Sequence, residues 1–443
     1  MVDVSSEFEV RRLGECELIS PLESHESGRR WKIFVNDSEK VPVDIVRGSA
    51  EGKVHAGRKA VCFEKAGPRK KIFFDPAKTR AAIVTCGGIC PGINDVIRSV
   101  VMTLYYRYGV RVILGIQNGY QGMVKKTGLE PVRLCPADVD HINHTGGTIL
   151  GTTRGQQDFK EMLDYLKARR INQLFVIGGD GTLRGAMELA EEAEKQNYCL
   201  SVVGIPKTVD NDILYVDRSF GFVSAMSAAG SVVEIAHNEA KSQPNGIGLV
   251  KLMGRHSGFI TCFAGLASGN ANFVLIPEVP FDFEGEKGLL KALEDRLKRR
   301  GHAVILVAEG AGQEHMPSKK EERDASGNVK FQDIGLLLRD KIFSYFQSRK
   351  IEVNLKYIDP SYIVRAIGAT AADSAYCFML GKNAVHAAMS GRTQVVVGLV
   401  HNIDVHIPMK LITRGRKHVD PDGSLWSSVL ESSGQPVSFK NLS

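Results

Sequence analysis

The chain has 443 residues, a length that suggests two or three domains. Apolar residues make up 43% of it and charged residues 24%, as in ordinary soluble globular proteins. The formal charge of +7 is modest for this length and no basic tract interleaved with aromatic residues is present, so we expect no nucleic-acid partner.

Residues 1–75 differ in character from the rest of the chain. They are polar, mixed in charge and interrupted by glycine and serine, with short β-like pieces such as residues 31–35. We interpret them as an accessory N-terminal extension rather than part of a catalytic core. Their first residues lack the apolar core of a signal peptide, and no apolar run in the chain approaches the length of a membrane span. We therefore expect a cytoplasmic protein with no membrane partner.

From residue 81 onward, apolar runs alternate with helical patterns. The runs are 81–85, 111–116, 173–177, 200–205, 246–252, 272–276, 303–308 and 394–400. Such alternation predicts an α/β fold of parallel strands covered by helices on both faces. We expect two similar doubly wound α/β domains facing a cleft, in addition to the N-terminal extension. The expected boundaries are 1–75 for the extension, 76–245 and 246–404 for the domains, and 405–443 for a C-terminal tail.

The first glycine turn is CGGICPG at 86–92. It follows the apolar run 81–85 and precedes apolar residues at helical spacing from 93 to 104, so it predicts a strand that ends at a helix N-terminus. This is a common phosphate-binding geometry, although the turn matches neither the dinucleotide fingerprint nor the GxxxxGK[ST] loop. Eight scattered cysteines without a CxxC pair fit reduced thiols, and we expect Cys86 and Cys90 to be small packing residues more than reactive ones.

The second glycine turn is GGDGT at 178–182, between the apolar run 173–177 and a helical pattern at 183–195. Its glycines let a ligand approach the backbone, and the helix N-terminus favours an anion. Asp180 would repel a phosphate unless a cation lies between them, and Mg²⁺ bridging carboxylate and phosphate oxygens resolves the conflict. A glycine hairpin without a ligand is the alternative, and the strand and helix that flank the turn make it the weaker one.

The third motif is PKTVDND at 206–212, directly after the apolar run 200–205. If the backbone stays extended past Pro206, the side chains of residues 208, 210 and 212 project from one face. A hydroxyl and two carboxylates on one face can bind a metal ion and take a proton from an alcohol. Asp-Asn-Asp is also ordinary turn chemistry, so a turn with no catalytic role is the alternative.

The remaining patterns predict structure without chemistry. Residues 286–300 form a charged amphipathic pattern that ends at Gly301, which predicts a solvated surface helix. Residues 311–331 predict a polar loop, and the tail from about 405 predicts a segment that wraps a surface.

Together these motifs resemble the phosphofructokinase family. The resemblance rests on TCGGICPG at 85–92, GGTILGTTR at 146–154, GGDGT at 178–182, PKTVDND at 206–212 and MGR at 253–255. By the order and spacing of these motifs it covers roughly residues 81–370, most of the chain. GGDGT alone would also fit lipid kinases and NAD kinase, but the last two motifs are not features of those families. The resemblance implies phosphoryl transfer to the 1-hydroxyl of fructose 6-phosphate, which gives fructose 1,6-bisphosphate.

The resemblance also implies roles for single residues. Asp210 corresponds to the general base, Asp180 to the magnesium ligand, and Asp212 to a carboxylate that supports the metal through water. The implied catalytic residues are Asp210, Arg154, Lys207, Arg255 and Thr208. The implied cofactor-binding residues are Gly88, Arg154, Gly178, Gly179, Asp180, Gly181 and Thr182. The implied substrate contacts are Thr208, Val209, Asp210, Met253, Gly254, Arg255, Glu309, Lys356, Tyr362 and Arg365. An ordinary ion pair between Glu309 and Arg365 is an alternative for those two.

Two positions bear on the phosphoryl donor. In this family a glycine after the motif aspartate leaves room for an adenine nucleotide, whereas a second carboxylate there goes with pyrophosphate, so Gly181 indicates ATP. Lys207 points the other way, because bacterial ATP-dependent members carry glycine there and pyrophosphate-dependent members carry lysine. The combination resembles long ATP-dependent enzymes with an N-terminal extension. We expect Mg-ATP as the donor, with a pyrophosphate-dependent enzyme as the alternative.

The chain also departs from the family pattern. Gly246 and Lys356 stand where bacterial members carry arginines that reach the sugar phosphate across a subunit interface, and Lys356 is the better candidate for such a contact in this chain. The resemblance implies a homotetramer and an allosteric enzyme, but the sequence identifies no effector site. A catalytically inactive, nucleotide-binding regulatory subunit is a further alternative, which the presence of both Asp180 and Asp210 makes weaker.

Overall fold

The computed structural model describes residues 4–22, 33–45, 61–316 and 331–441. The chain divides into two compact units, and neither unit is a continuous stretch of sequence. The first unit comprises Met1–Thr208, Ile213–Phe220 and Gly368–Arg416, and the second comprises Val209–Asp212, Gly221–Ile367 and Lys417–Ser443. These boundaries differ from the expected 76–245 and 246–404, because the chain returns to the first unit after residue 367 and to the second after residue 416.

The first unit is built on a nine-stranded mixed sheet with the order β3-β4-β17-β16-β10-β9-β6-β7-β8. Strands β16, β10, β9, β6 and β7 are parallel, and the strands at both edges are antiparallel. The strand bounds are β3 (Lys40–Pro42), β4 (Cys62–Lys65), β17 (Ile403–Pro408), β16 (Val395–Val400), β10 (Ser201–Pro206), β9 (Gln173–Gly178), β6 (Arg80–Thr85), β7 (Val112–Ile116) and β8 (Val132–Arg133).

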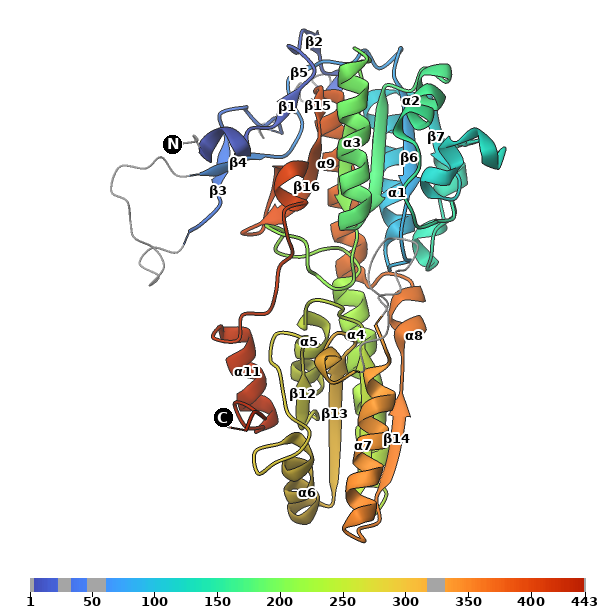
Figure 1. Cartoon of the computed structure of the whole chain (residues 1–443). Helices are drawn as coiled ribbons and strands as arrows, with labels where there is room; N and C mark the ends of the chain where they lie inside the picture. The colour runs from blue at the N-terminus through green and yellow to red at the C-terminus, as the bar shows by residue number, and fades with distance from the viewer. Residues whose placement is uncertain (1–3, 23–32, 46–60, 317–330, 442–443) are drawn as a thin grey trace. The chain divides into compact units, whose positions relative to one another are not determined.

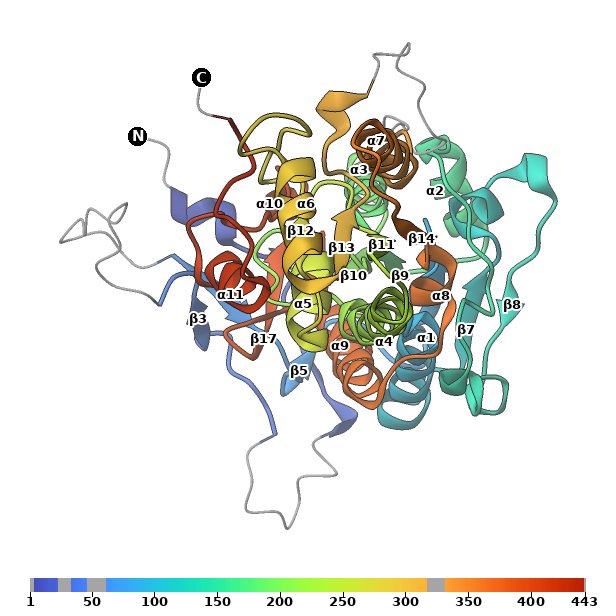
Figure 2. The ribbon, with the colours of Figure 1, turned by 90° about the horizontal axis from the view of Figure 1, so that it is seen from below.

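Helices cover both faces of this sheet (Figures 1 and 2). Helices α2 (Phe159–Ala168) and α3 (Asp180–Lys195) lie on one face, and α1 (Ile93–Met102) and α9 (Ala371–Met389) pack together on the other. Short helix α10 (Met409–Ile412) follows β17 and contacts α3. The central strands are buried along their whole length, as expected for parallel strands with two covered faces.

The second unit is a four-stranded parallel sheet with the order β12-β13-β11-β14. Its strands are β12 (Phe273–Leu275), β13 (His302–Ala308), β11 (Gly246–Leu252) and β14 (Asn354–Ile358). Its helices are α4 (Phe222–Lys241), α5 (Phe259–Ser268), α6 (Leu289–Arg300), α7 (Ile334–Ser348), α8 (Ser361–Ala366) and α11 (Ser424–Ser433). Helices α6 and α7 share a core with one face, while α4 and α5 lie on the other (Figure 2). Both units are therefore doubly wound, which confirms the predicted α/β class.

Each of the eight apolar runs becomes a strand, with bounds within two residues of those expected. The sequence did not predict β14 or β17, because each carries polar residues that weaken its apolar pattern. The expected tail boundary at residue 405 falls inside β17. The predicted β-like piece at 31–35 is wrong for residues 33–35, which have no regular structure. Residues 31–32 lie outside the described part of the chain. Helix α6 (Leu289–Arg300) is followed by Gly301 with φ +73°, the end that was predicted, but it begins three residues after the expected start at 286.

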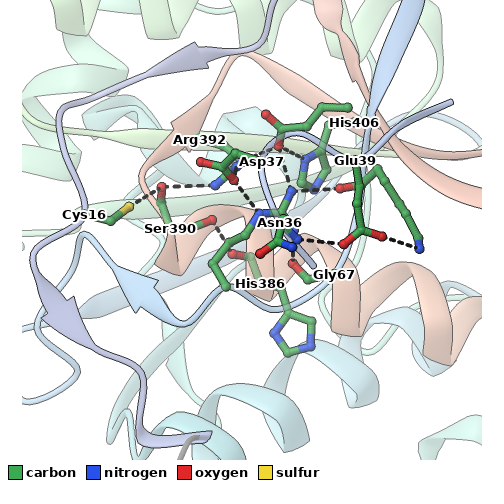
Figure 3. A network of polar contacts seen from close by, with 12 residues as sticks. Cys16, Asn36, Asp37, Glu39, Gly67, His386, Ser390, Arg392 and His406 are labelled. Atoms are coloured by element: carbon green, nitrogen blue, oxygen red, sulfur yellow. Dashed lines mark hydrogen bonds and ion pairs between the residues drawn. The ribbon is translucent and has the colours of Figure 1, made fainter. Parts of the chain in front are cut away.

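The N-terminal segment is joined to the first unit by both strands and charges. Strands β3 and β4 extend the large sheet through β17, and β1 (Arg11–Arg12) pairs with β15 (Arg392–Thr393). Figure 3 shows a network of polar contacts at this junction. Glu64 accepts hydrogen bonds from Arg69 (3.0 Å), His406 (2.9 Å) and Arg392. The expected accessory extension is therefore an integral edge of the first unit.

The C-terminal segment is likewise part of the second unit. Helix α11 packs on α5. The Gln435 side chain accepts a hydrogen bond from the Val274 amide (2.7 Å), and Phe439 is buried against Phe273 with ring centroids 5.8 Å apart. This fits the expectation of a segment that covers a surface. None of the helices in the described ranges has the length and apolar character needed to cross a membrane.

Candidate active site

In the first unit, the predicted motifs lie at one edge of the sheet. Strands β10, β9 and β6 are neighbours and parallel, so their carboxyl ends are adjacent, where ligands bind in open α/β sheets. The Cys86 amide donates to the Ile177 carbonyl (3.0 Å), and the Lys207 amide donates to the Gly178 carbonyl (2.9 Å). These bonds place the two glycine turns and the start of the 206–212 motif side by side.

Gly178 and Gly181 of the second turn are glycine for different structural reasons. A Cβ on Gly178 would lie 2.3 Å from Cγ2 of Thr182, so packing requires that glycine. A Cβ on Gly181 would meet nothing within 4 Å. Gly181 lies in the first turn of α3, where glycine costs about 1 kcal/mol relative to alanine. Packing within the unit does not explain Gly181, so the open space beside it is available to a ligand.

Cationic side chains surround the first glycine turn. The Lys207 side chain is nearly buried, and its ammonium donates to the Gly88 carbonyl. A Cβ on Gly88 would lie 3.4 Å from Nη2 of Arg154. The segment that carries Arg154 is tied to this turn by a hydrogen bond from Oγ1 of Thr152 to the Gly87 carbonyl (2.7 Å). Backbone amides and two cations at the end of a strand can hold the phosphates of a nucleotide.

Asp180 is the first residue of α3, directly after Gly179. Its carboxylate forms ion pairs with Arg416 (3.5 Å) and Arg184 (3.8 Å). Arg416 lies 236 residues away from Asp180 and carries no local signal, so the sequence did not predict this partner. A carboxylate beside a phosphate-binding turn suits Mg²⁺, which is commonly held by one or two carboxylates together with substrate phosphates and water.

The 206–212 motif is a bend, not an extended strand. Strand β10 ends at Pro206, and Asn211 adopts a left-handed conformation with φ +55°. The expected alternation of residues 208, 210 and 212 along a strand is therefore wrong, and the turn interpretation is correct for the backbone. Asparagine tolerates this conformation because its short side chain can bond to the local backbone. Asp210 and Asp212 thus leave the large sheet and belong to the second unit.

In the second unit, the segments that follow β13, β11 and β14 carry several of the predicted substrate residues. Glu309 follows β13, and its amide donates to the Leu252 carbonyl at the end of β11 (2.9 Å). Gly254 has φ +127°, and a Cβ there would lie 2.5 Å from the Ser257 carbonyl oxygen, so both conformation and packing require glycine. Oγ of Ser257 donates to the Asp210 carbonyl (3.0 Å), which brings Asp210 to the segment after Arg255.

The pKa of Asp210 is raised to about 7. Burial is the largest cause, and the negative charges of Asp212 and Glu309 raise it further, while Arg255 opposes the shift. A carboxyl group with a pKa near neutrality can accept a proton efficiently at physiological pH. Such a group in a site of charged residues is typical of a catalytic base.

Tyr362 and Arg365 lie on α8, just after β14. The Arg365 guanidinium lies over the Tyr362 ring, 4.8 Å from its centroid, and its Nε has no hydrogen-bond partner in the described part of the chain. No ion pair joins Arg365 to Glu309 within the described ranges, so the ordinary ion-pair alternative was wrong. Lys356 lies on the exposed edge strand β14.

Packing explains the departure at residue 246. A Cβ on Gly246 would lie 1.9 Å from the Ala240 carbonyl oxygen, so this position excludes an arginine. Of the other predicted contacts, Val209 is buried and Met253 is partly buried. Thr208 ends the first unit's part of the motif, and its carbonyl accepts a hydrogen bond from Oγ of Ser219 (2.7 Å).

Comparison with protein-family models matches residues 80–388 to the family described as phosphofructokinase. The chain belongs to the phosphofructokinase family. It is 49% identical over 441 residues to the ATP-dependent 6-phosphofructokinase of Borreliella burgdorferi, with 98% of each chain covered. It is 46% identical over 441 residues to the ATP-dependent 6-phosphofructokinase of Amycolatopsis methanolica, covering 98% of this chain and 96% of that one. It is also 46% identical to ATP-dependent 6-phosphofructokinase 7 of Arabidopsis thaliana, covering 91% and 82%.

Solved structures show the same fold. The pyrophosphate-dependent phosphofructokinase of Marinobacter aquaeolei matches with a TM-score of 0.66 at 21% identity, covering 82% of this chain and 94% of that one. The phosphofructokinase of Pichia pastoris in the T-state matches with a TM-score of 0.63 at 24% identity, covering 81% and 37%. At these identities the likeness supports the α/β fold of the family and not the choice of donor.

Proposed function

We propose that this phosphofructokinase transfers the γ-phosphoryl group of ATP to the 1-hydroxyl of fructose 6-phosphate, giving fructose 1,6-bisphosphate and ADP, the committed step of glycolysis. The observation that carries the proposal is the Asp210 carboxyl, with its pKa of about 7, held beside Arg255 and Glu309. The names of the curated relatives above support ATP as the donor.

In this mechanism Asp210 accepts the proton of the attacking 1-hydroxyl. Phosphoryl transfer needs positioning and charge stabilisation more than covalent help from the protein. Arg154, Lys207 and Arg255 stabilise the negative charge on the equatorial oxygens of the transferring group. Asp180 would hold Mg²⁺, with Asp212 contributing through water. When bound, Mg²⁺ neutralises phosphate charge.

The second unit binds the sugar phosphate. Met253, Gly254 and Arg255 at the end of β11, with Glu309 after β13, contact the sugar, and Arg365 binds its 6-phosphate. The Arg365 guanidinium, with an Nε that lacks a hydrogen bond in the described chain, has donor capacity for a phosphate. Lys356 on the exposed edge strand is suited to reach the substrate of a neighbouring copy, since we also propose a homotetramer.

The cofactor turn favours ATP over pyrophosphate. The open space at Gly181 leaves room for the rest of the nucleotide beyond the transferred group. A carboxylate at this position would place negative charge where the α-phosphate of ATP lies. Lys207 serves either donor, because a cation near the transferring group helps in both cases.

The proposal is tested by measuring fructose 1,6-bisphosphate formed from fructose 6-phosphate and Mg²⁺ with ATP or pyrophosphate in parallel. We expect activity with ATP only. Activity with pyrophosphate alone would overturn the donor assignment, and no activity with either would leave the regulatory-subunit alternative. In the same assay Asp210→Asn should lower kcat by about 10²–10⁴-fold with little change in KM. Light scattering on the purified protein tests the homotetramer.

A further inference from the structure

Lys251 is a charged residue inside the otherwise apolar strand β11, two residues before Met253. Its side chain is only 11% exposed. The ammonium bonds to two carboxylates, Oδ2 of Asp333 at 2.7 Å and Oδ2 of Asp359 at 2.8 Å. Burial alone would raise the pKa of both carboxyl groups, but the hydrogen bonds from Lys251 lower the pKa of each. Lys251 thus holds two segments, one through Asp333 and the other through Asp359, against the inner strand β11 of the second unit.

The segment that Lys251 holds through Asp333 contacts Arg255. Asp333 caps α7, since its Oδ1 accepts hydrogen bonds from the amides of Gly335 (2.9 Å) and Leu336 (3.2 Å). Two residues earlier, the Phe331 ring lies 4.9 Å from the centre of the Arg255 guanidinium, a cation–π contact. Fixing Asp333 therefore fixes the aromatic ring that supports Arg255.

The same segment also reaches Glu309. Nε2 of Gln313 donates to the Glu309 carbonyl (2.8 Å) and to the Gln332 carbonyl (3.1 Å). Gln332 is the residue between Phe331 and Asp333. The segment 331–333 is therefore connected to both Arg255 and Glu309, which follow different strands.

The segment that Lys251 holds through Asp359 continues into helix α8. Asp359 follows β14, and its Oδ1 accepts a hydrogen bond from the Ser361 amide (3.1 Å) at the first residue of α8. Tyr362 and Arg365 lie within this six-residue helix. A helix this short depends on its attachments for its position, because isolated helices below about 12–15 residues are marginal.

We propose that Lys251 is a positioning residue for the sugar-phosphate site: its two ion pairs hold Phe331, and through it Arg255, in register with Tyr362 and Arg365 on α8. This inference rests on the function proposed above. Removing the ammonium leaves two neighbouring carboxylates that repel each other, so the two segments separate and the phosphate-binding arginines lose their alignment. The cofactor turns belong to the first unit and the Lys251 ion pairs to the second.

The test compares Lys251→Met, which keeps the length of the side chain, with Lys251→Arg, which keeps the charge. In steady-state assays of the full chain, Lys251→Met should raise KM for fructose 6-phosphate about 10-fold and also lower kcat, because Arg255 contacts the transferring group as well as the sugar phosphate. KM for ATP should change less than about two-fold. Lys251→Arg should restore much of the affinity. The matched control Lys291→Met removes an exposed lysine that pairs with Asp295 on α6, and should change neither KM.

Two outcomes would overturn the inference. One is an unchanged KM for fructose 6-phosphate in Lys251→Met; the other is an equal loss of both affinities with a lower melting temperature, which indicates a purely structural role. Should Lys251→Met not fold, Asp359→Asn cuts only the attachment to α8 and should still raise KM for the sugar phosphate alone. Arg255→Ala distinguishes failure of the positioning role from failure of the proposed function. If Arg255→Ala raises KM for fructose 6-phosphate but Lys251→Met and Asp359→Asn do not, only the positioning role of Lys251 is wrong. Absence of ATP-dependent activity in the unmodified chain would instead overturn the proposed function.

Discussion

At the scale of single residues, the neighbours of Asp210 decide its chemistry. An aspartate in water has a pKa near 3.8 and is a weak base at neutral pH. Burial and the charges of Asp212 and Glu309 raise the pKa to about 7. The same interactions that suit Asp210 to accept a proton also disfavour its ionised form in the folded protein, so activity and stability oppose each other at this residue.

The first prediction concerns pH. Because Asp210 must be ionised to act as a base, kcat/KM should fall as pH drops below about 7, with one proton involved. Between pH 3.8 and about 7, Asp210 is protonated in the folded protein and ionised in the unfolded chain. This group therefore lowers the free energy of unfolding as pH rises through that range. Asp210→Asn should therefore raise the melting temperature at about pH 8 and have little effect at about pH 4.

Activity profiles and thermal melts of both proteins check this prediction. The Asn variant, assayed with the same substrates, controls for titration of the phosphates. If its residual activity shows the same acidic limb as the unmodified enzyme, Asp210 is not the titrating group.

The second prediction concerns Gly181. Since a Cβ at this position would contact nothing, Gly181→Ala should fold normally and gain up to about 1 kcal/mol in helix α3. Gly181→Asp should also fold, but its carboxylate should raise KM for ATP by about 10-fold or more through repulsion of the phosphates. KM for fructose 6-phosphate is the internal control. Equal ATP affinity in the Asp variant would contradict the assigned space for the nucleotide.

At the scale of elements, the antiparallel edge of the first unit's sheet depends on buried charge. Strand β17 carries His406 in the core, where burial lowers the pKa of the imidazole to about 4. His406 contacts Glu64 of β4, which also receives hydrogen bonds from Arg392 and Arg69 (Figure 3). The N-terminal strands are thus fixed to the sheet by a carboxylate that several cations share, and not by apolar packing alone.

The third prediction is that Glu64→Gln strongly destabilises the first unit. Removing one partner of a buried ion pair leaves charges without compensation and typically costs about 3–5 kcal/mol. Glu39→Gln is the control, because the side chains of Glu39 and its partner Lys65 are 36% and 39% exposed and such a solvated pair contributes at most about 1 kcal/mol. Denaturant unfolding measures both. Equal midpoints for the two variants would show that the network does not hold the N-terminal strands.

The charge network also predicts sensitivity to acid. The folded pKa of Glu64 lies well below its ordinary value, because the hydrogen bonds and charges of His406 and Arg392 outweigh the effect of burial. The pKa of His406 is lowered by its burial. Both groups bind protons more readily in the unfolded chain, so their contribution to stability is present at neutral pH and decreases as pH falls below about 6.

At the scale of the whole molecule, the first and last described segments of the chain are parts of folded units. The N-terminal strands close one edge of the large sheet, and the C-terminal segment returns to cover β12 of the smaller one. Neither unit corresponds to a single stretch of sequence. A fragment cut at the sequence boundaries 246–404 would therefore lack part of the core of each unit.

The fourth prediction tests the C-terminal closure. Phe439 is 3% exposed in the core of the second unit, so Phe439→Ala should lower the free energy of unfolding by about 3–5 kcal/mol. Val437, two residues earlier, is 75% exposed, and Val437→Ala should have almost no effect. Thermal or denaturant unfolding of both variants checks this. A small loss for Phe439→Ala would mean that the segment only covers the surface.

The sequence by itself determined the α/β class, the strands that carry the site and the family. The eight long apolar runs are central or well-covered strands, whose burial requires the continuous apolar pattern that a reader of the sequence can see. Motifs such as GGDGT and PKTVDND report their chemistry because backbone turns and catalytic groups are contiguous in sequence. Asp180 was expected to meet magnesium from its place in the glycine turn, whereas the general-base role of Asp210 followed from the family resemblance, and both roles stay predictions.

Only the tertiary structure decided which distant residues meet. Arg416 pairs with Asp180 across 236 residues, and Lys251 in β11 joins Asp333, just before α7, to Asp359, just after β14. Strands β14 and β17 escaped notice because polar residues such as Lys356 and His406 interrupt their patterns. The physical reason is the same in each case. The residues around a charged side chain in the sequence do not indicate which distant residue it will contact. The fold alone determines whether that side chain is solvated or buried beside an opposite charge.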